Sequence, residues 1–450
     1  MNRNDDTLVL FPYDWDALGC DRQGVPRPNR VGFDLHRFPA NLRLAAFDID
    51  RFTAGLARRA DRAGWRGVTS GHEQFGALAA ARLAERMGWA GPPVRAVLAC
   101  QHKLHARRVL AEVAPEANPD TFGLVDMPYN GTVPADVPYP AFVRPIKAAF
   151  SVLATEVRDA ADLHRHTRFG PLERVIIRRL VEPFHRLQRR VLPEADNPHR
   201  LYYETPVGGA QYNLDGYVHD GTVHALGVVD AHMYPGTNAF QRFEYPSRLP
   251  AAVQRRAFDV ARRFLAAIGF DHGLFNMEFF YDPASDRLTV IEFNPRLAAQ
   301  FADLYRRVDG VDPHAIALAL ARGRDPATLS RATPTARVAA SFVYRAFSAD
   351  TVPPPPSRDA RQRLHELDPD SLFLAFPKRG RALEREFRWL NSHRYGVLHL
   401  GAASRETLLR ACARASLQLG WPAPLPPDEA GQEAPHPTLP PTERPAFEGA

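Results

Sequence analysis

The residues of this chain best suited to chemistry are two glutamates, an asparagine and an arginine in its second half. Glu278 lies in the alternating apolar run GLFNMEFFY, Glu292 and Asn294 lie in a second run, LTVIEFN, and Arg296 follows after one proline. Two carboxylates and an amide oxygen are hard ligands of the kind that Mg²⁺ prefers. An arginine beside them could stabilise an anion that develops during a reaction.

Both runs are predicted to be strands of one β-hairpin, which covers residues 273–296. The connecting sequence DPASD is a turn signature between two alternating apolar runs. If the turn centres near Ser285, Glu278 and Glu292 lie opposite each other, because side chains alternate between the two faces of a strand. The same alternation predicts that Val290 shares a face with Glu292.

Two opposed carboxylates in apolar strands repel each other, and burying both without a partner is costly. A divalent cation between them resolves this conflict and favours a metal–phosphate site. The alternative is structural: Glu278 and Glu292 pair with nearby arginines, and Asn294 only opens a turn before Pro295. For any one residue the structural reading is simpler, whereas the complete set favours the metal site.

The first hundred residues are predicted to form a parallel α/β domain, because strand and helix patterns alternate along them. The predicted strands are Thr7–Pro12, Leu44–Asp50 and Val94–Cys100. The segment EQFGALAAARLAERMGW, between the last two, has the apolar spacing of a helix. The domain is expected to span residues 1–100.

The rest of the chain is predicted to be α+β, with one domain over residues 101–330 and another over 331–420. Its clearest predicted elements are a helix over 102–113, a long helix over 251–270, strands over 337–347 and 396–404, and a closing helix over 406–420. Residues 421–450 are rich in Pro, Glu and Ala and are predicted to be a disordered tail.

The composition is that of a soluble globular protein. The 450 residues are 45% hydrophobic and 24% charged, and the arginines behind the formal net charge of +6 are scattered along the chain, which argues against nucleic-acid binding. The three cysteines are widely spaced, which predicts reduced thiols in place of disulfides or a zinc site. No secretory signal or membrane span is recognisable, so a cytoplasmic protein that binds no membrane is expected.

The acid pair followed by Asn-Pro-Arg resembles the ATP-grasp superfamily, in particular its carbamoyl-phosphate synthetases, biotin carboxylases and amino-acid ligases. The resemblance covers residues 67–420. It implies an ATP-grasp domain with a Rossmann-like domain before it and a lid-like extension after it. It also implies that Glu278, Glu292 and Asn294 hold two Mg²⁺ ions, or Mn²⁺, on the phosphates of ATP, while Arg296 contacts the reacting phosphoryl or acyl group.

Further segments match the order of this family. Glu204 takes the position that accepts a hydrogen bond from the adenine region of ATP. Gln211, seven residues on, stands where the family usually has a ribose-binding acid. Arg144 and Lys147 correspond to cations on the strand and loop that cover the phosphates, and Lys103 to a basic residue that reaches a phosphate.

Two regions depart from the family pattern or vary within it. The phosphate loop, usually rich in glycine, reads Ala148, Ala149 and Phe150 here, which predicts a less mobile lid. In the variable substrate region, His232 and Arg242 are the candidates to face the transferred phosphate.

The resemblance implies an ATP-dependent ligase that activates a carboxylate as an acyl phosphate and joins it to an amine, with Arg296 and Arg242 stabilising the anion. ADP and phosphate are the expected by-products. The alternatives are a bicarbonate-activating enzyme like the carboxylases and an ATP-binding protein that no longer catalyses. The expected partners are a small-molecule carboxylate and an amine of unknown identity, and a homodimer stays open because related enzymes are often dimers.

Overall fold

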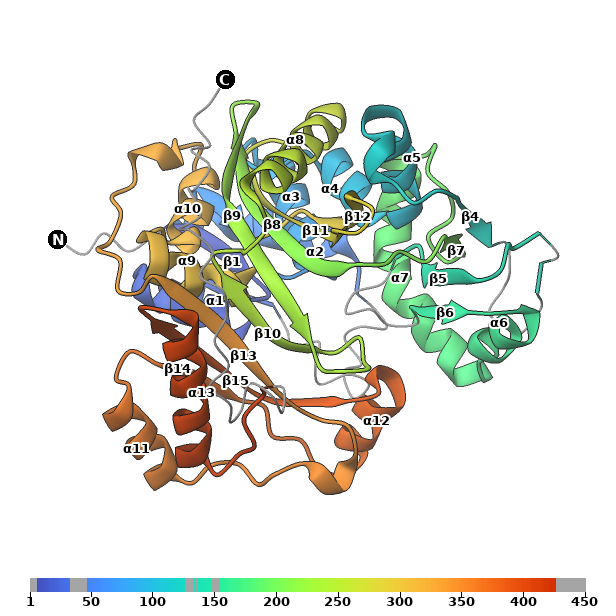
Figure 1. Ribbon diagram of the computed structural model, residues 1–450. Helices are drawn as coiled ribbons and strands as arrows, with labels where there is room; N and C mark the ends of the chain where they lie inside the picture. Colours follow the sequence, from blue (N-terminus) through green and yellow to red (C-terminus); the bar gives the residue numbers. More distant parts are fainter. Residues whose placement is uncertain (1–5, 33–46, 126–132, 135, 148–153, 426–450) are drawn as a thin grey trace.

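The computed structural model describes residues 6–32, 47–125, 133–134, 136–147 and 154–425 (Figure 1). Its strands form three sheets: a three-stranded sheet near the N-terminus, a four-stranded sheet in the middle of the chain, and an eight-stranded sheet. The four-stranded sheet lies at the right of Figure 1, beside α6 and α7, and the long strands of the eight-stranded sheet cross the centre.

The N-terminal sheet is parallel and has the strand order β2-β1-β3. Parallel neighbours need crossover connections: α1 lies between β1 and β2 in the chain, and β2 and α2 lie between β1 and β3. The elements here are β1 (Thr7–Leu10), α1 (Asp14–Arg22), β2 (Arg30–Val31), α2 (Ile49–Ala63), β3 (Gly67–Thr69), α3 (Gly76–Met87) and α4 (Val94–Gln101). The predicted α/β character of this region is confirmed.

The apolar segment Val94–Cys100 is helical, so its prediction as a strand is wrong. It forms most of α4, in which nearly every residue is buried. The helix packs among α3, α5 and α7 and also contacts β12. Because every residue of the run except Arg95 is apolar, the run lacks the periodicity that separates a helix from a buried strand.

Two other predicted segments differ from the structure. Of the predicted strand over 44–50, residues 44–46 lie outside the described residues, and Ile49 begins α2, capped by the side chain of Asp48. The predicted tail begins at Trp421, yet Trp421 is buried and its indole N–H donates to the carbonyl of Pro354 at 3.0 Å. The packed part of the chain therefore continues past residue 420.

The four-stranded sheet is antiparallel and has the order β4-β7-β5-β6. The elements in this part are α5 (Lys103–Val113), β4 (Phe122–Val125), β5 (Ala141–Pro145), β6 (Thr155–Val157), α6 (Ala160–Thr167), α7 (Pro171–Val191) and β7 (Leu201–Glu204). The predicted helix over 102–113 is confirmed as α5, whereas the loop of Ala148, Ala149 and Phe150 lies outside the described residues.

The eight-stranded sheet is antiparallel throughout, in the order β12-β11-β8-β9-β10-β13-β15-β14. Its strands are β8 (Ala210–His219), β9 (Thr222–Met233), β10 (Phe240–Tyr245), β11 (Gly273–Asp282), β12 (Arg287–Asn294), β13 (Val338–Ala346), β14 (Leu372–Ala375) and β15 (His393–Ala402). Because β10 pairs with β13, one sheet crosses residue 330, where a third domain was predicted to begin.

The helices of this half are α8 (Ala251–Ala267), α9 (Ala302–Asp309), α10 (Pro313–Leu320), α11 (Arg358–Leu367), α12 (Arg381–Leu390) and α13 (Arg405–Leu419). α8, β13, β15 and α13 confirm the predicted helix over 251–270, the two later strands and the closing helix. The ring of Phe264 on α8 stacks on that of Phe293 on β12, with centroids 3.9 Å apart. This packing determines which face of β12 points into the core.

The cysteines and the helices bear on two further predictions. Cys100 and Cys412 are buried thiols outside any disulfide, as the sequence predicts, and Cys20 is also buried. Within the described ranges, no helix has the length and apolar character to cross a membrane.

Candidate active site

The predicted hairpin is formed by β11 and β12, and it places the two glutamates side by side. Glu278 pairs directly with Glu292, and Asn276 with Asn294, so the four side chains share one face of the sheet. On the neighbouring strand β8, the amide nitrogen of Gln211 donates to Glu278 Oε2 at 2.8 Å. The predicted opposition of Glu278 and Glu292 is confirmed.

A β-bulge interrupts the hairpin just beside this pair. The register shifts after Glu278, so that Phe279 pairs with Val290 and Ile291 is an extra residue on β12. Val290 belongs to the same buried core as Phe279. The prediction that Val290 shares a face with Glu292 is therefore wrong, because the extra residue breaks the simple alternation.

The two carboxylates have different partners and opposite electrostatics. Lys103 and Arg144 both form ion pairs with Glu292 Oε2, the latter at 2.9 Å. Burial alone would raise the pKa of Glu292, but these cations outweigh it and lower the pKa. Burial, followed by the charge of Glu292, raises the pKa of Glu278. Glu292 thus stays ionised, while Glu278 favours its neutral form in the absence of a bound cation.

Two further cations approach the same acids. Lys147 is buried, lies 5.3 Å from the ring centroid of Phe184, and has its pKa lowered to about 8 by burial. Arg296 donates to Glu73 at 2.9 Å, and its charge acts on both Glu278 and Glu292. The predicted residues that the structure gathers in one cluster are Lys103, Arg144, Lys147, Gln211, Glu278, Glu292, Asn294 and Arg296.

Glu204 is buried between two arginines. Arg107 Nε donates to its Oε2 at 2.8 Å, and Arg144 donates to its Oε1 at 3.2 Å. Both carboxylate oxygens are therefore occupied, although the resemblance implies that Glu204 accepts from the adenine region. Arg107 also donates to the carbonyls of Val290 and Ile291, at 2.6 and 2.9 Å, and so fastens the bulge of β12 to α5.

Arg242 lies on the other face of the sheet. Glu244 and Phe279 lie in one row of residues that pair directly across β10, β9, β8 and β11, so their side chains share one face of the sheet. Arg242, two residues before Glu244, shares the face of Phe279, whereas Glu278 points to the opposite face. Arg242 Nε donates to Glu244 at 2.7 Å, and His232 pairs with Arg242 across β9 and β10. The structure does not bring Arg242 or His232 to the acid pair.

Tyr13 and Glu73 also face the cluster, and the sequence reasoning did not single them out. Tyr13 lies on the short segment between β1 and α1. Burial raises the pKa of its phenol, and the charges of Glu73 and Arg296 also act on it. Its ring also stacks on His72, with centroids 4.9 Å apart. The sequence could have indicated Tyr13, because the residue lies just beyond the carboxyl end of a predicted strand, which is where ligands of open α/β sheets bind.

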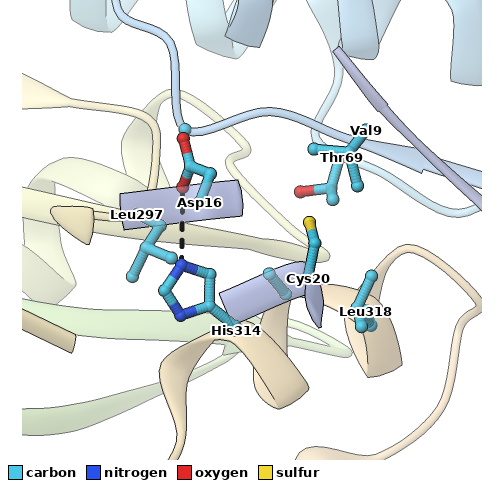
Figure 2. Close-up of a pocket in the computed structure, with 9 residues that line it drawn as sticks. Val9, Asp16, Cys20, Thr69, Leu297, His314 and Leu318 are labelled. Carbon is cyan, nitrogen blue, oxygen red and sulfur yellow. Dashed lines mark ion pairs between the residues drawn. The ribbon is translucent and has the colours of Figure 1, made fainter. Parts of the chain in front are cut away.

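The start of α1, and with it Tyr13, is held by a buried ion pair. Figure 2 shows the imidazole of His314 facing the carboxylate of Asp16, and Nε2 lies 3.5 Å from Oδ1. The second carboxylate oxygen of Asp16 accepts the backbone N–H of Tyr13 at 3.0 Å. A Cβ on Gly19 would lie 2.3 Å from His314 Cγ, so glycine is required where the imidazole crosses α1.

Two arginines in the C-terminal part of the sheet lie next to each other, near Trp15. Arg345 of β13 pairs directly with Arg394 of β15. Within the described part of the chain, neither guanidinium forms an ion pair with a carboxylate, and Arg394 lies 5.4 Å from the ring centroid of Trp15. Burial lowers the pKa of both, and the charge of Arg394 helps to lower that of Arg345 to about 10. Two half-buried cations that repel each other favour an anion near them.

The donor chemistry of the acid pair fits Mg²⁺. Glu278, Glu292 and Asn294 offer carboxylate and amide oxygens on one face, and Asn294 donates to Glu278 Oε1 at 3.3 Å. Burial, and after it the charge of Glu292, raises the pKa of the Glu278 carboxyl, so a divalent cation between the two acids would favour the ionised form of both.

No protein-family model matches the chain. It is 27% identical over 279 residues to the uncharacterized protein y4rH of Sinorhizobium fredii, a match that covers 60% of this chain and 52% of y4rH. A shorter match, 39% identical over 95 residues, is to carnosine synthase 1 of Gallus gallus and covers 21% of this chain and 10% of the synthase. The chain thus spans about half of the first relative and a tenth of the second.

Solved structures resemble the chain over nearly all of its length. The L-amino acid ligase from Bacillus licheniformis superposes with a TM-score of 0.66 at 14% identity, covering 93% of this chain and 98% of the ligase. The N5-carboxyaminoimidazole ribonucleotide synthetase of Thermus thermophilus gives 0.59 at 17% identity, covering 92% and 98% of the two chains. The biotin carboxylase of Campylobacter jejuni gives 0.57 at 13% identity, covering 92% and 91%. The chain has the ATP-grasp fold, as the sequence resemblance implied.

Proposed function

We propose that this chain is an ATP-dependent ligase that activates a carboxylate as an acyl phosphate and joins it to an amine. The observation that carries the proposal is the opposed pair Glu278 and Glu292, with Asn294 beside it and four cations around it. Buried acids with pKa values shifted in opposite directions are typical of functional sites. A magnesium nucleotide supplies both the cation that the acids lack and the anion that the basic residues favour.

Glu278, Glu292 and Asn294 are the proposed ligands of Mg²⁺, in one or two ions, with Mn²⁺ as an alternative. When bound, the metal neutralises charge on the β- and γ-phosphates and stabilises the transferred phosphoryl group. Lys103 and Arg144 now pair with Glu292, and in the proposed complex they contact phosphate oxygens. Gln211 supports Glu278 through its hydrogen bond.

In the proposed reaction, a carboxylate oxygen of the substrate attacks the γ-phosphorus, and the bond between that phosphorus and the bridging oxygen of ADP breaks. The products of this step are ADP and an acyl phosphate. An amine then attacks the acyl carbon, loses a proton and expels phosphate, which leaves an amide. Arg296, oriented by Glu73, is proposed to stabilise the charge on the transferred phosphoryl group.

Amino acids are the substrate class that the residues around the acid pair support best. Arg345 and Arg394 offer two half-buried guanidinium groups to an anion such as a carboxylate. The charge of Tyr13 acts on Arg394, and that of Arg296 acts on Tyr13. The structural likeness to an L-amino acid ligase and the short match to carnosine synthase 1 agree with this choice.

The test is release of ADP by the purified protein with Mg²⁺ and ATP, using amino acids singly and in pairs, and bicarbonate as a separate substrate. The proposal predicts that ADP release depends on a pair and that mass spectrometry detects the matching amide. Release with bicarbonate alone would support the carboxylase-like alternative. If no carboxylate and amine produce ADP above background, the ligase proposal fails.

A further inference from the structure

The tip of the β8–β9 hairpin lies beside the start of β11, far along the sheet from the acid pair. His219 ends β8 and Asp220 begins the turn, while His272 immediately precedes β11. Gly273 pairs with Val218, so the register carries His272 next to His219 although the two are distant in sequence. In Figure 1 this hairpin tip rises at the top of the molecule, on the far side from the four-stranded sheet.

Three side chains at this tip converge at distances that suit a metal ion. His272 Nε2 lies 3.3 Å from Asp220 Oδ1, and His219 Nδ1 lies 3.8 Å from Asp220 Oδ2. One ligand atom from each residue falls within 4.8 Å of the others. In a tetrahedral zinc site with bonds of about 2.0–2.1 Å, the ligand atoms are about 3.3 Å apart. Small side-chain rotations therefore suffice to form the site.

Asp271 holds His272 in the orientation that a metal ligand needs. Its Oδ1 lies 3.3 Å from His272 Nδ1 and accepts the backbone N–H of His272 at 2.7 Å. Histidine ligands usually donate their second ring N–H to a carboxylate, which fixes the tautomer and directs the other nitrogen at the metal. Here the nitrogen left over is Nε2, which faces Asp220.

The charge around the tip also favours a cation. Within the described residues, neither Asp220 nor Asp271 has an arginine or lysine as an ion-pair partner, so no basic side chain already neutralises them. The Asp220 side chain is 75% exposed and can turn toward an ion, whereas those of His219 and His272 are 13% and 23% exposed.

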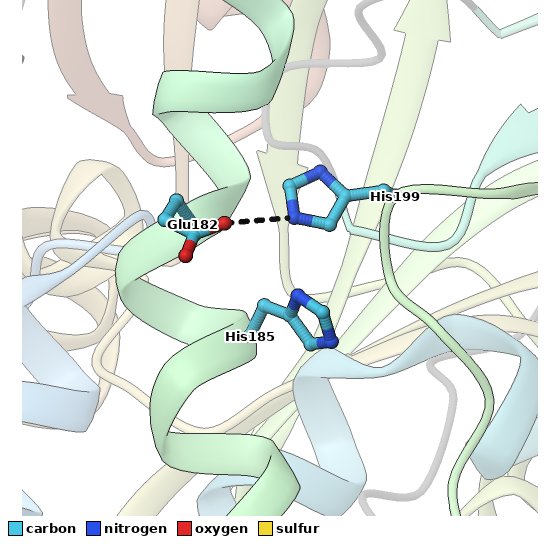
Figure 3. Close-up of side chains that lie close together, drawn as sticks. All are labelled: Glu182, His185 and His199. Carbon is cyan, nitrogen blue, oxygen red and sulfur yellow. Dashed lines mark ion pairs between the residues drawn. The ribbon is translucent and has the colours of Figure 1, made fainter. Parts of the chain in front are cut away.

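A second group with metal-ligand residues, on and beside α7, has the opposite charge environment. Figure 3 shows Glu182 and His185 on the helix with His199 facing the glutamate. Arg186 already pairs with Glu182 at 3.1 Å. The charges of Arg178 and Arg189 also act on His185, whose pKa is lowered first by burial and then by these arginines. A metal ion there would face several cations, so this group serves as a control.

We propose that His219, Asp220 and His272 bind Zn²⁺ or a similar first-row divalent ion, with water in the fourth position. Two imidazoles and one carboxylate are ligands of this metal class. The bound ion joins the β8–β9 turn to the segment before β11. It is separate from the acid pair, because His219 lies eight residues along β8 from Gln211, a distance of about 26 Å in an extended strand.

The test titrates the full chain with Zn²⁺ by calorimetry and with Co²⁺ by visible absorption, which reports the ligand geometry. The wild type is expected to bind one ion at the tip. His219→Asn combined with His272→Asn should weaken that binding by roughly tenfold or more, and Asp220→Asn, which keeps the left-handed turn conformation, should also weaken it.

Two control variants separate the tip from other sites. His185→Asn with His199→Asn, and Glu278→Gln with Glu292→Gln, should both retain the tip's affinity for Zn²⁺ and its Co²⁺ spectrum. The proposal is overturned if the His219 and His272 substitutions, or the milder Asp220→Asn, leave Zn²⁺ binding unchanged. It is also overturned if binding disappears only with the His185 and His199 substitutions. None of these outcomes depends on whether the chain is a ligase.

Discussion

Glu278 and Glu292 are directly paired on adjacent strands, yet their surroundings shift their pKa values in opposite directions. Lys103 and Arg144 keep Glu292 ionised, whereas burial and the neighbouring negative charge favour the neutral form of Glu278. The two basic residues therefore balance only one of the two acids. A divalent cation would balance the other and release the basic residues for phosphate, which is the basis of the proposed function.

Replacing Arg107 by methionine should destabilise the protein by about 3–5 kcal/mol. The substitution removes one of the two cations that pair with the buried Glu204, and it leaves two backbone carbonyls of β12 without their hydrogen-bond donor. Urea denaturation followed by circular dichroism measures this change. Arg108→Met is the matched control, since Arg108 is 46% exposed and pairs with Asp196 at the surface. The bridging role of Arg107 is refuted if both variants lose the same small amount of stability.

The ion pair between His314 and Asp16 should make the stability of the protein depend on pH in the alkaline range. Burial alone would lower the pKa of His314, but Asp16 and Asp312 outweigh it and raise the pKa to about 9. A raised pKa contributes stability that is present below the ordinary value and is lost as the pH rises through the folded-state value. The free energy of unfolding should therefore fall by about 1–3 kcal/mol between about pH 7 and about pH 10.

His314→Gln is the comparison that isolates this effect, because other groups titrate in the same range. The variant should be less stable than the wild type at neutral pH, and the difference between the two should shrink as the pH rises. A difference that stays constant across the range would show that His314 is not held in its charged form.

Arg394→Gln should raise KM for the carboxylate substrate by roughly tenfold or more and leave the affinity for magnesium nucleotide unchanged. The reason is that Arg394 faces Trp15 and Tyr13, whereas the proposed phosphate contacts come from other cations. Steady-state kinetics with the amino acids found active would measure KM, and the exposed Arg379→Gln is the control. An equal loss of nucleotide affinity would contradict the assignment of Arg394 to substrate.

The hairpin and its acids were predictable because alternation and a turn signature act over short distances. The resemblance supplied Lys103, Arg144 and Lys147, which lie far from the hairpin in the sequence and which no local pattern would group with it. Glu73 reaches the cluster, and Arg394 comes near Tyr13, only through the packing of distant elements. No sequence signal distinguishes Arg394 from the many other arginines.

The predictions that failed share a physical cause: local alternation does not reveal an extra residue or a fully buried helix. The bulge at Ile291 moved Val290 to the core face, and in α4 every residue except Arg95 is buried. The placement of Arg242 likewise depends on strand register across four strands, which the sequence between them does not specify.

The central claim is tested most directly by calorimetry of a non-hydrolysable ATP analogue, with and without Mg²⁺, on the wild type and on Glu278→Gln with Glu292→Gln. The wild type should bind the analogue tightly only with Mg²⁺, and the double variant should lose roughly tenfold or more of that affinity, while the exposed Glu112→Gln keeps it. Binding that needs no Mg²⁺, or that survives in the double variant, would contradict the assignment of Glu278 and Glu292 as the metal ligands.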